Sequence, residues 1–344
     1  MSDLPAVLAI DVGNSKTDVA LLAADGRVLG AVRGPTGSHQ QVGLAGAAAV
    51  IGSLVAGAAR EAGIGEDPPF AWVGAFCAAG VDTARDERLL ARALGDPGFV
   101  ERLILRNDTF AALRAGTERG WGVAVIAGSG MNGLGVGSTG RIVRFDGLGD
   151  ASGDWGGGAG LGMAAHGAAV RARDRRGPRT SLERLVPALF GLASPGAVTR
   201  RLYDGRITER EMAALAPVVF RASAAGDAAA AGIVDRLAAE MAAFAIAAIR
   251  RLGARRLDVE VVLAGGLARS RDARLLGAIS DRVRAVAPRA RLVVVDAPPV
   301  VGAALLGFDE LAGGHVDAAV AARLRRELTD ARLAGADAPG ARRR

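Results

Sequence analysis

The chain has 344 residues, half of them hydrophobic, which is enough for two domains with buried cores. A single cysteine, Cys77, excludes an internal disulfide and a cysteine-rich metal site, and its apolar surroundings predict a buried side chain. No apolar run reaches the roughly 18 residues of a membrane span, and the N-terminus lacks the charged start of a secretory signal. We therefore expect a cytoplasmic protein with no membrane partner.

The formal net charge of +7 raises the question of a nucleic-acid partner. The arginines are spread along the chain and mixed with acids, and the only short basic cluster is expected at 342–344. Aromatic residues make up 4% of the chain, so no platform for base stacking is visible, and we expect no nucleic-acid partner. Lys16 is the only lysine among 43 basic residues, and it stands in a glycine-containing turn beside an aspartate. This position can reflect either chance or a function.

Apolar runs and turn residues predict three strands at the start, followed by alternating helices and strands. The strands are expected at 7–11, 17–22 and 28–33, because tight turns separate these runs. The first half then continues with a helix at 41–61, a strand at 71–76, a helix at 83–94 capped by Thr83, a strand at 103–105 and a helix at 110–115.

The same order then restarts. Strands are expected at 123–127, 133–136 and 141–145, followed by helices of which the longest is capped by Asp227, and then by a strand at 259–264, a helix at 271–286, a strand at 292–295 and a helix at 300–306. The glycine-dense segment 149–162 is expected to be a mobile loop, and the tail past Leu328 to be loosely ordered.

This long-period repeat predicts an α/β protein of two lobes, each with the order βββαβαβα, that flank a cleft. We expect a small first lobe at 1–113, a larger second lobe at 114–309, and a C-terminal segment at 310–344 whose helix packs on the first lobe. Ligands are expected where the loops at the strand ends converge.

The turn between the first two strands reads Asp11-Val12-Gly13-Asn14-Ser15-Lys16-Thr17. Amides in such a turn can cradle an anion, so we assign Gly13, Asn14, Ser15, Lys16 and Thr17 to phosphate binding. Asp11 stands where a carboxylate can hold Mg²⁺, directly or through water. Because Ser15 occupies the second glycine position, the segment is not a Walker A loop. An ordinary hairpin with a solvated acid is the alternative.

The second glycine-rich turn contains Gly128, Ser129 and Gly130, and its spacing matches a dinucleotide fingerprint. That fingerprint needs a helix after the turn, whereas here the chain continues as strand. A second phosphate-binding hairpin that mirrors the first is the better interpretation. The pair Gly265 and Gly266 ends a later strand before a helix, where an adenine or an α-phosphate can approach closely, although a plain strand–helix turn is equally compatible.

Asp108 ends a strand and leads into a helix. A carboxylate there can orient an attacking hydroxyl and accept its proton. An ordinary helix N-cap is the alternative interpretation.

Taken in this order, the motifs resemble the sugar-kinase branch of the actin, hexokinase and Hsp70 ATPase superfamily, which has the actin-like, ribonuclease H-like fold. Within it they are most similar to the N-acetylglucosamine kinase family, which is grouped with the BadF-type ATPases. The resemblance extends from Asp11 to about Gly307. It implies ATP and Mg²⁺ as cofactors, Asp108 as the catalytic base, Gly265 and Gly266 in the adenosine motif, and a homodimer.

The resemblance also implies sugar contacts. The segment 34–39 resembles the family's first sugar loop, and Asn132 matches a sugar-binding asparagine. The loop 148–158 departs from the usual Gly-Asp-Glu-Gly-Ser pattern and resembles the actinobacterial glucosamine kinases. The expected sugar-binding residues are Ser38, His39, Asp108, Asn132, Asp150, Asp154 and Trp155.

Two residues of that loop have alternative roles. Asp154 would favour the ammonium of glucosamine over a neutral amide, or it shapes the loop through local hydrogen bonds. Trp155 stacks on the sugar or anchors the loop.

The resemblance therefore implies an ATP-dependent glucosamine kinase that phosphorylates the 6-hydroxyl. An N-acetylglucosamine kinase is the alternative, and a non-catalytic sugar-sensing ATPase is the weaker one. The ATPase activators of radical dehydratases share the fold, but they need paired cysteines for an iron–sulfur cluster, and this chain has only Cys77.

Overall fold

The computed structural model describes residues 4–65, 67–95 and 98–335. The chain forms two compact units, one combining Met1–Trp121 with Asp296–Arg344 and the other formed by Gly122–Val295. Residues 114–121 and 296–309, expected in the second lobe, thus belong to the first unit. The cause is α11 (Val300–Ala312), which packs against β1, β4 and α3 (Asp108–Gly116), and whose Asp309 forms a bidentate ion pair with the buried Arg114 of α3.

The first unit is built on a five-stranded mixed sheet with the order β3-β2-β1-β4-β5. β1 is the central strand: it pairs antiparallel with β2 across a tight hairpin, and parallel with β4, which the chain reaches through a helix after β3. The strands are β1 (Val7–Val12), β2 (Thr17–Leu22), β3 (Val28–Gly34), β4 (Ala71–Ala78) and β5 (Val100–Asn107).

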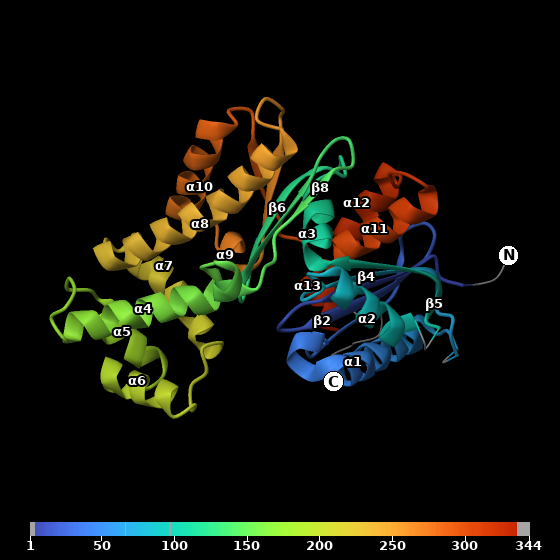
Figure 1. The fold of residues 1–344 in the computed structure, drawn as a ribbon. Coiled ribbons are helices and arrows are strands. Elements are labelled where there is room, and N and C mark those ends of the chain that lie inside the picture. The colour runs from blue at the N-terminus through green and yellow to red at the C-terminus, as the bar shows by residue number, and fades with distance from the viewer. Residues whose placement is uncertain (1–3, 66, 96–97, 336–344) are drawn as a thin grey trace. The chain divides into compact units, whose positions relative to one another are not determined.

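Helices cover both faces of this sheet (Figure 1). One face carries α1 (His39–Ala62) and α2 (Ala84–Gly95), and Thr83 caps α2 as expected by accepting from the Asp86 amide. The other face carries α11, α12 (Ala318–Glu327) and α13 (Asp330–Leu333), whose leucines join the core with β1. Because Leu333 is buried there, the expectation of a loose tail past Leu328 is wrong for α13. The basic cluster at 342–344 lies outside the described residues.

Among the described residues, α1 is the one helix long and apolar enough to cross a membrane by length and composition. This differs from the expectation that no apolar run reaches that length, because its alanine, valine, leucine and isoleucine residues raise its mean hydropathy. Buried side chains along α1, such as Ile51 and Val55, belong to the core that packs on the sheet. A helix that covers a sheet passes the same test, so α1 is weak evidence for a membrane span.

The second unit repeats the sheet with the order β10-β9-β6-β7-β8. Its strands are β6 (Gly122–Ala127), β7 (Met131–Val136), β8 (Ile142–Arg144), β9 (Glu260–Ala264) and β10 (Arg291–Val294). Read from the central strand of each sheet, the antiparallel hairpin and the parallel crossover occur in the same order in both units. The duplicated α/β fold predicted from the sequence is confirmed.

Helices also make up much of the second unit. They are α4 (Gly157–Arg173), α5 (Leu182–Leu189), α6 (Pro195–Tyr203), α7 (Ala216–Ala224), α8 (Ala228–Leu252), α9 (Gly266–Arg269) and α10 (Ala273–Val286), with short 3₁₀ turns at Gly149–Ser152 and Glu211–Leu215. Asp227 caps α8 as predicted, accepting from the amides of Ala229 and Ala230.

The expectation of a mobile loop over 149–162 is wrong for its second half, which forms the start of α4. At Gly157, Gly158 and Gly162, neighbouring atoms leave no room for a side chain. A Cβ on Gly162 would lie 2.0 Å from the Met212 carbonyl oxygen. The glycines thus permit close packing and do not signal mobility.

Candidate active site

A row of polar side chains crosses the sheet of the first unit near the ends of its strands. Strand register places Cys77, Asp11, Asp18 and Arg33 side by side on β4, β1, β2 and β3. Cys77 is buried, as predicted. Asp18 is fully buried, and Arg33 compensates its charge through Nε and Nη2 at 2.6 and 2.9 Å. The row therefore sets a buried carboxylate, Asp11, beside a neutralised one.

Asp11 has the environment of a cation site. It is 5% exposed, and burial raises its pKa well above the usual range, as do the neighbouring charges of Asp18 and Asp108, against the opposing charges of Lys16 and Arg33. A cation next to Asp11 would restore its ionised form. No group of three or more histidine, cysteine, aspartate or glutamate side chains able to hold a metal occurs in the described part of the chain. Mg²⁺ commonly takes one or two protein carboxylates together with substrate phosphates, so the single carboxylate fits that ion.

The first glycine turn is tied to the predicted sugar loop. The Gly13 amide donates to the Lys16 carbonyl at 2.9 Å, which closes the turn between β1 and β2. Thr36 Oγ1 donates to the Gly13 carbonyl at 2.8 Å, and the Gly37 amide donates to Thr17 Oγ1 at 2.8 Å. The side chain of Thr17 thus faces the sugar loop, and the two predicted motifs form one connected structure.

Ser38 and His39 begin α1 at the end of that loop. Ser38 Oγ and His39 Nδ1 are buried, and neither has a hydrogen-bond partner among the described residues. Buried polar atoms are normally paired, so two adjacent atoms of this kind fit a ligand that carries hydroxyl groups. On its other side, His39 Nε2 lies 3.9 Å from Asp86 Oδ1.

Asp108 is the first residue of α3 and not its cap. The cap is Asn107, whose side chain accepts from the Thr109 amide at 3.1 Å, so the interpretation of Asp108 as an N-cap is wrong. The carboxyl of Asp108 is half-buried. Desolvation and the charge of Asp82 raise its pKa to about 7, against hydrogen bonds from backbone amides. A base with this pKa can exchange a proton near neutral pH.

The remaining predicted residues lie in the second unit. The Gly128 amide donates to the Gly130 carbonyl at 3.0 Å and closes the turn between β6 and β7. The start of α4 packs on this turn, because the Gly158 amide donates to the Gly128 carbonyl at 2.7 Å. Gly265, with φ at +93°, lies against the same turn, and a Cβ there would be 2.3 Å from the Ala127 carbonyl oxygen. Gly128 and Gly265 therefore belong to one cluster.

Gly157 supplies a test of this cluster. It has φ at +66°, and an added Cβ would lie 2.5 Å from both Gly130 Cα and the Ser129 carbonyl oxygen. We expect Gly157→Ala to displace the second turn and to weaken binding of Mg-ADP by at least about tenfold, since small misplacements of positioning groups are costly. Calorimetric titration measures this. Gly167→Ala, in the same helix with nothing within 4 Å, is the control, and equal affinities for the two variants would contradict the expectation.

The loop before α4 is held by its own side chains. Ser152 Oγ donates to the Asp154 carboxylate and accepts from the Leu148 amide at 2.8 Å. Arg236 lies over the Trp155 ring at 3.9 Å from its centroid. These contacts support the loop-shaping alternative for Asp154 and the anchoring alternative for Trp155. Asp150 is exposed, and Asn132 Oδ1 accepts from the Gly133 amide at 2.7 Å.

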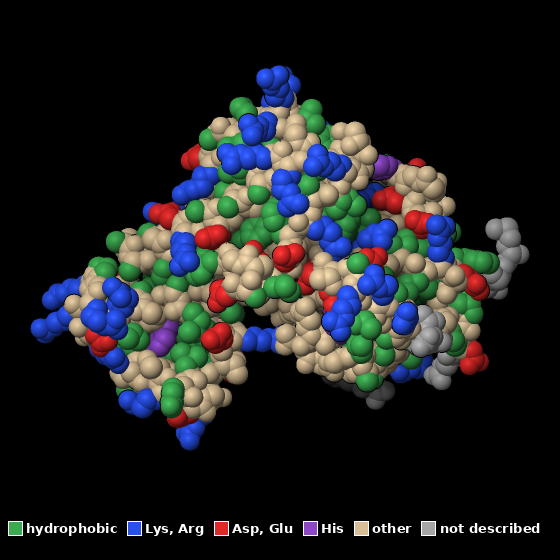
Figure 2. Space-filling model, in the orientation of Figure 1, with side chains coloured by type: hydrophobic (Ala, Val, Ile, Leu, Met, Phe, Trp, Pro, Cys, Tyr) green, Lys and Arg blue, Asp and Glu red, His purple; other side chains and the backbone are tan. Residues whose placement is uncertain are grey.

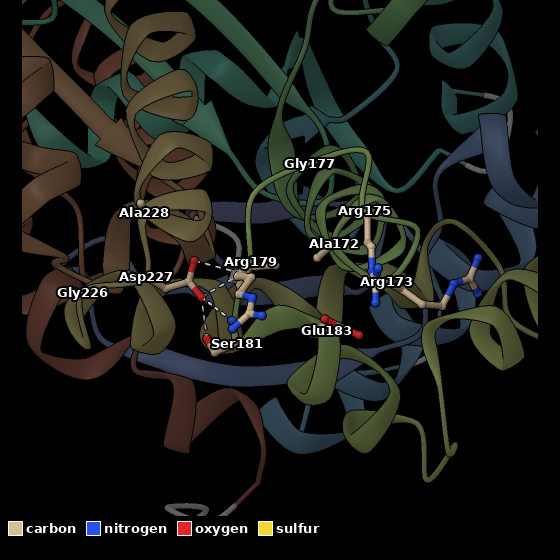
Figure 3. Close-up of a pocket in the computed structure, with 11 residues that line it drawn as sticks. Ala172, Arg173, Arg175, Gly177, Arg179, Ser181, Glu183, Gly226, Asp227 and Ala228 are labelled. Atoms are coloured by element: carbon tan, nitrogen blue, oxygen red, sulfur yellow. Dashed lines mark hydrogen bonds between the residues drawn. The ribbon is translucent and has the colours of Figure 1, made fainter.

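An open groove of about 1220 Å³ lies elsewhere in the second unit, near the end of α4 and the start of α8 (Figure 3). No predicted site residue lines it. Hydrogen bonds from Ser181, the Ala230 amide and Thr180 outweigh the effect of burial and lower the pKa of Asp227 to about 2. This carboxylate therefore ties the segment before α5 to the start of α8.

Basic side chains gather at the tip of the second unit formed by the ends of α4 and α5 (Figure 2). The segment 171–179 holds five arginines and one aspartate. The expectation that 342–344 is the only short basic cluster is therefore wrong.

Four functional candidates were not predicted from the sequence. Asp82 follows β4 at the same edge as Asp108, and the rule that ligands gather at strand ends would have found it. Asp18 and Arg33 need the strand register, and Asp330 on α13 lies 314 residues from its contact Lys16.

Known proteins similar to this chain agree with the fold. An N-acetylmuramic acid/N-acetylglucosamine kinase from Clostridium acetobutylicum is 28% identical over 262 residues, which is 76% of this chain and 85% of that protein. An N-acetyl-D-glucosamine kinase from Dictyostelium discoideum is 27% identical over 88% of this chain and 97% of its own. The crystal structure of a candidate N-acetylglucosamine kinase from Chromobacterium violaceum superposes with a TM-score of 0.69 at 26% identity, covering 89% of this chain and all of that one.

These similarities confirm the predicted actin-like fold. The sequence profile of the BadF/BadG/BcrA/BcrD ATPase family matches residues 8–307, which include both glycine turns, Asp108 and the Gly265-Gly266 pair. Because the match covers most of the chain, this protein belongs to the BadF/BadG/BcrA/BcrD ATPase family.

Proposed function

We propose that this protein is an ATP-dependent amino-sugar kinase that phosphorylates the 6-hydroxyl of N-acetylglucosamine. The observation that carries the proposal is the half-buried carboxyl of Asp108, whose pKa of about 7 suits a general base. It is joined by the unpartnered buried atoms of Ser38 and His39, which suit a polyhydroxylated ligand. The named kinase activities of the relatives agree with this site.

In this mechanism the protein mainly positions groups and stabilises charge. Asp108 orients the sugar hydroxyl and accepts its proton as the new oxygen–phosphorus bond forms. The turn at Gly13–Thr17 and the turn at Gly128–Gly130 bind the phosphates of ATP through amides and side-chain donors. Asp11 would hold Mg²⁺, which supplies charge neutralisation of the phosphates when it is bound.

The choice of N-acetylglucosamine as the proposed substrate rests on the relatives more than on the loop that contains Asp154. The sequence favours glucosamine through Asp154, but the relatives carry the N-acetylglucosamine name and so support the alternative better. Glucosamine stays the second candidate, because Asp154 is an acid that is not fully buried, in a loop that resembles the glucosamine kinases. The hydrogen bond from Ser152 agrees with a structural role for it.

Asp154→Asn separates the two candidates. We expect kcat/KM for N-acetylglucosamine and glucosamine to fall together, by about two- to tenfold, because the loop loses the hydrogen bond from Ser152 to an ionised group. Asp150→Asn, in the same loop but exposed, is the matched control. A loss confined to glucosamine would show that Asp154 binds the ammonium and would favour the second candidate.

The first assay is coupled ADP release with Mg-ATP on N-acetylglucosamine, glucosamine, glucose and mannosamine. We expect the highest kcat/KM on N-acetylglucosamine. ADP release that does not depend on any sugar would overturn the kinase proposal. Sugar binding without ADP release would instead support the sugar-sensing alternative.

A further inference from the structure

Four charged groups form a closed ring beside the first glycine turn. Lys16 Nζ lies 3.3 Å from Asp18 Oδ2 and 3.5 Å from Asp330 Oδ1. Arg33 Nη2 donates to the same two oxygens at 2.9 and 2.7 Å. Each carboxylate thus bridges both cations, and the formal charges of the ring sum to zero.

One member of this ring comes from the far end of the chain. Asp330 begins α13, beyond the residues that match the family profile. The segment 318–333 is fixed on the sheet by other contacts, including an ion pair of 2.7 Å between Arg323 and Asp25 and a hydrogen bond of 3.2 Å from the Val28 amide to Glu327. Buried Leu324 and Leu333 add apolar packing. Asp330 therefore lies next to Lys16 on a segment that is held in place by other contacts.

The ring restrains the ammonium of Lys16. The side chain keeps a third of its surface exposed. Its ammonium has three donors, of which one is hydrogen-bonded to Asp330, while Asp18 holds it through an ion pair. A long, flexible lysine side chain otherwise loses rotamer entropy when it binds a ligand. An ammonium that is already restrained loses less, so a donor outside the ring is available for a phosphate oxygen at a lower entropic cost.

We propose that Asp330 is a positioning residue that holds Lys16 for the phosphates of ATP, so that the C-terminal segment 318–333 is part of the nucleotide site. The inference rests on the proposed function, because it requires a nucleotide at the Gly13–Thr17 turn. It gives a role to the single lysine of the chain and to a segment that the family match does not include.

A double-mutant cycle tests the inference by calorimetric titration of Mg-ADP into the full chain. Asp330→Asn is expected to raise the Kd about two- to fivefold, the range of one partly exposed ion pair. Lys16→Ala is expected to raise it further, and Asp330→Asn in that background to add nothing, because the effect runs through Lys16. Asp330→Glu should restore most of the affinity. Asp25→Asn removes another anchor of the same segment and should leave the Kd unchanged.

The outcomes separate this inference from the proposed function. A wild-type chain that binds no Mg-ADP overturns both. If the wild type binds Mg-ADP and Asp330→Asn binds it with an equal or lower Kd, the inference alone is overturned. The inference is also overturned if Asp330→Asn raises the Kd by the same factor in the Lys16→Ala background as in the wild type. It is overturned as well if Asp25→Asn raises the Kd as much as Asp330→Asn, because binding would then depend on docking of the segment and not on the ring. Melting temperatures identify any variant that fails to fold, and Asp330→Ser then replaces it in the cycle.

Discussion

Asp108→Asn is expected to lower kcat on N-acetylglucosamine by about 10²- to 10⁴-fold, the usual contribution of a general base. The amide keeps the shape of the side chain but accepts no proton from the hydroxyl. Binding of Mg-ADP should stay within about twofold of the wild type, because Asp108 does not belong to either glycine turn. Asp174→Asn, an exposed carboxylate of the second unit, is the control. A variant with near-native turnover would show that Asp108 is not the base.

The pKa of Asp108 adds a pH dependence to this prediction. Because the base must be ionised, kcat/KM of the wild type should rise with pH through about 7 and then level off. The contribution of Asp108 to folding stability changes with pH in the opposite direction. A carboxyl whose pKa is raised in the folded state holds its proton there, so its contribution to stability falls as the pH rises from about 4 to 7. At pH 8 the Asp108→Asn variant should melt at or above the wild-type temperature, and a clear decrease would contradict the assigned burial.

Gly302→Ala is expected to cause the largest loss of stability. Gly302 lies in α11, and a Cβ there would be 1.8 Å from the Ala111 carbonyl oxygen of α3. Backbone on the opposing side cannot rotate away, so the helices must separate, at a cost of about 1–3 kcal/mol or more. For a unit of this size each kcal/mol lowers the melting temperature by about 2–4 °C.

The same change should reduce activity, because α3 carries Asp108 at its first turn. A shift of about 1 Å in a positioning element costs about a hundredfold in rate. Gly277→Ala is the matched control, since this exposed glycine of α10 has nothing within 4 Å of the added Cβ. Replacing it should raise the free energy of unfolding by about 0.5–1 kcal/mol through helix propensity. Equal effects of the two alanines would contradict the role assigned to Gly302.

Local patterns were enough to predict the strands and the two glycine turns. The run 17–22 was bounded by turn residues on both sides, and β2 has those limits. Glycine-rich sequence was harder to interpret, because Gly157 and Gly162 serve close packing in α4, and only the opposing backbone reveals this. Glycine content alone therefore predicts flexibility at these positions.

The polar partners of the site were predictable only in part. Asp11 and Asp108 stand at strand ends, a position that the chain pattern reveals. Asp18 and Arg33 become a pair through the register of β2 and β3, and Asp330 reaches Lys16 through the path of the C-terminal segment. Contacts of this kind depend on tertiary structure, which no local periodicity encodes.

The division of the chain has a consequence for the order in which it folds. The second unit is one continuous stretch, Gly122–Val295, whereas the first needs both ends of the chain. During synthesis the second unit can complete its core while α11 and α13 are still missing from the first. Until they arrive, the face of β1 that packs on Val301 and Leu305 stays uncovered, and apolar surface of this kind is a point of aggregation for a nascent chain. Residues made after the second unit are thus the ones that close the sheet bearing Asp11.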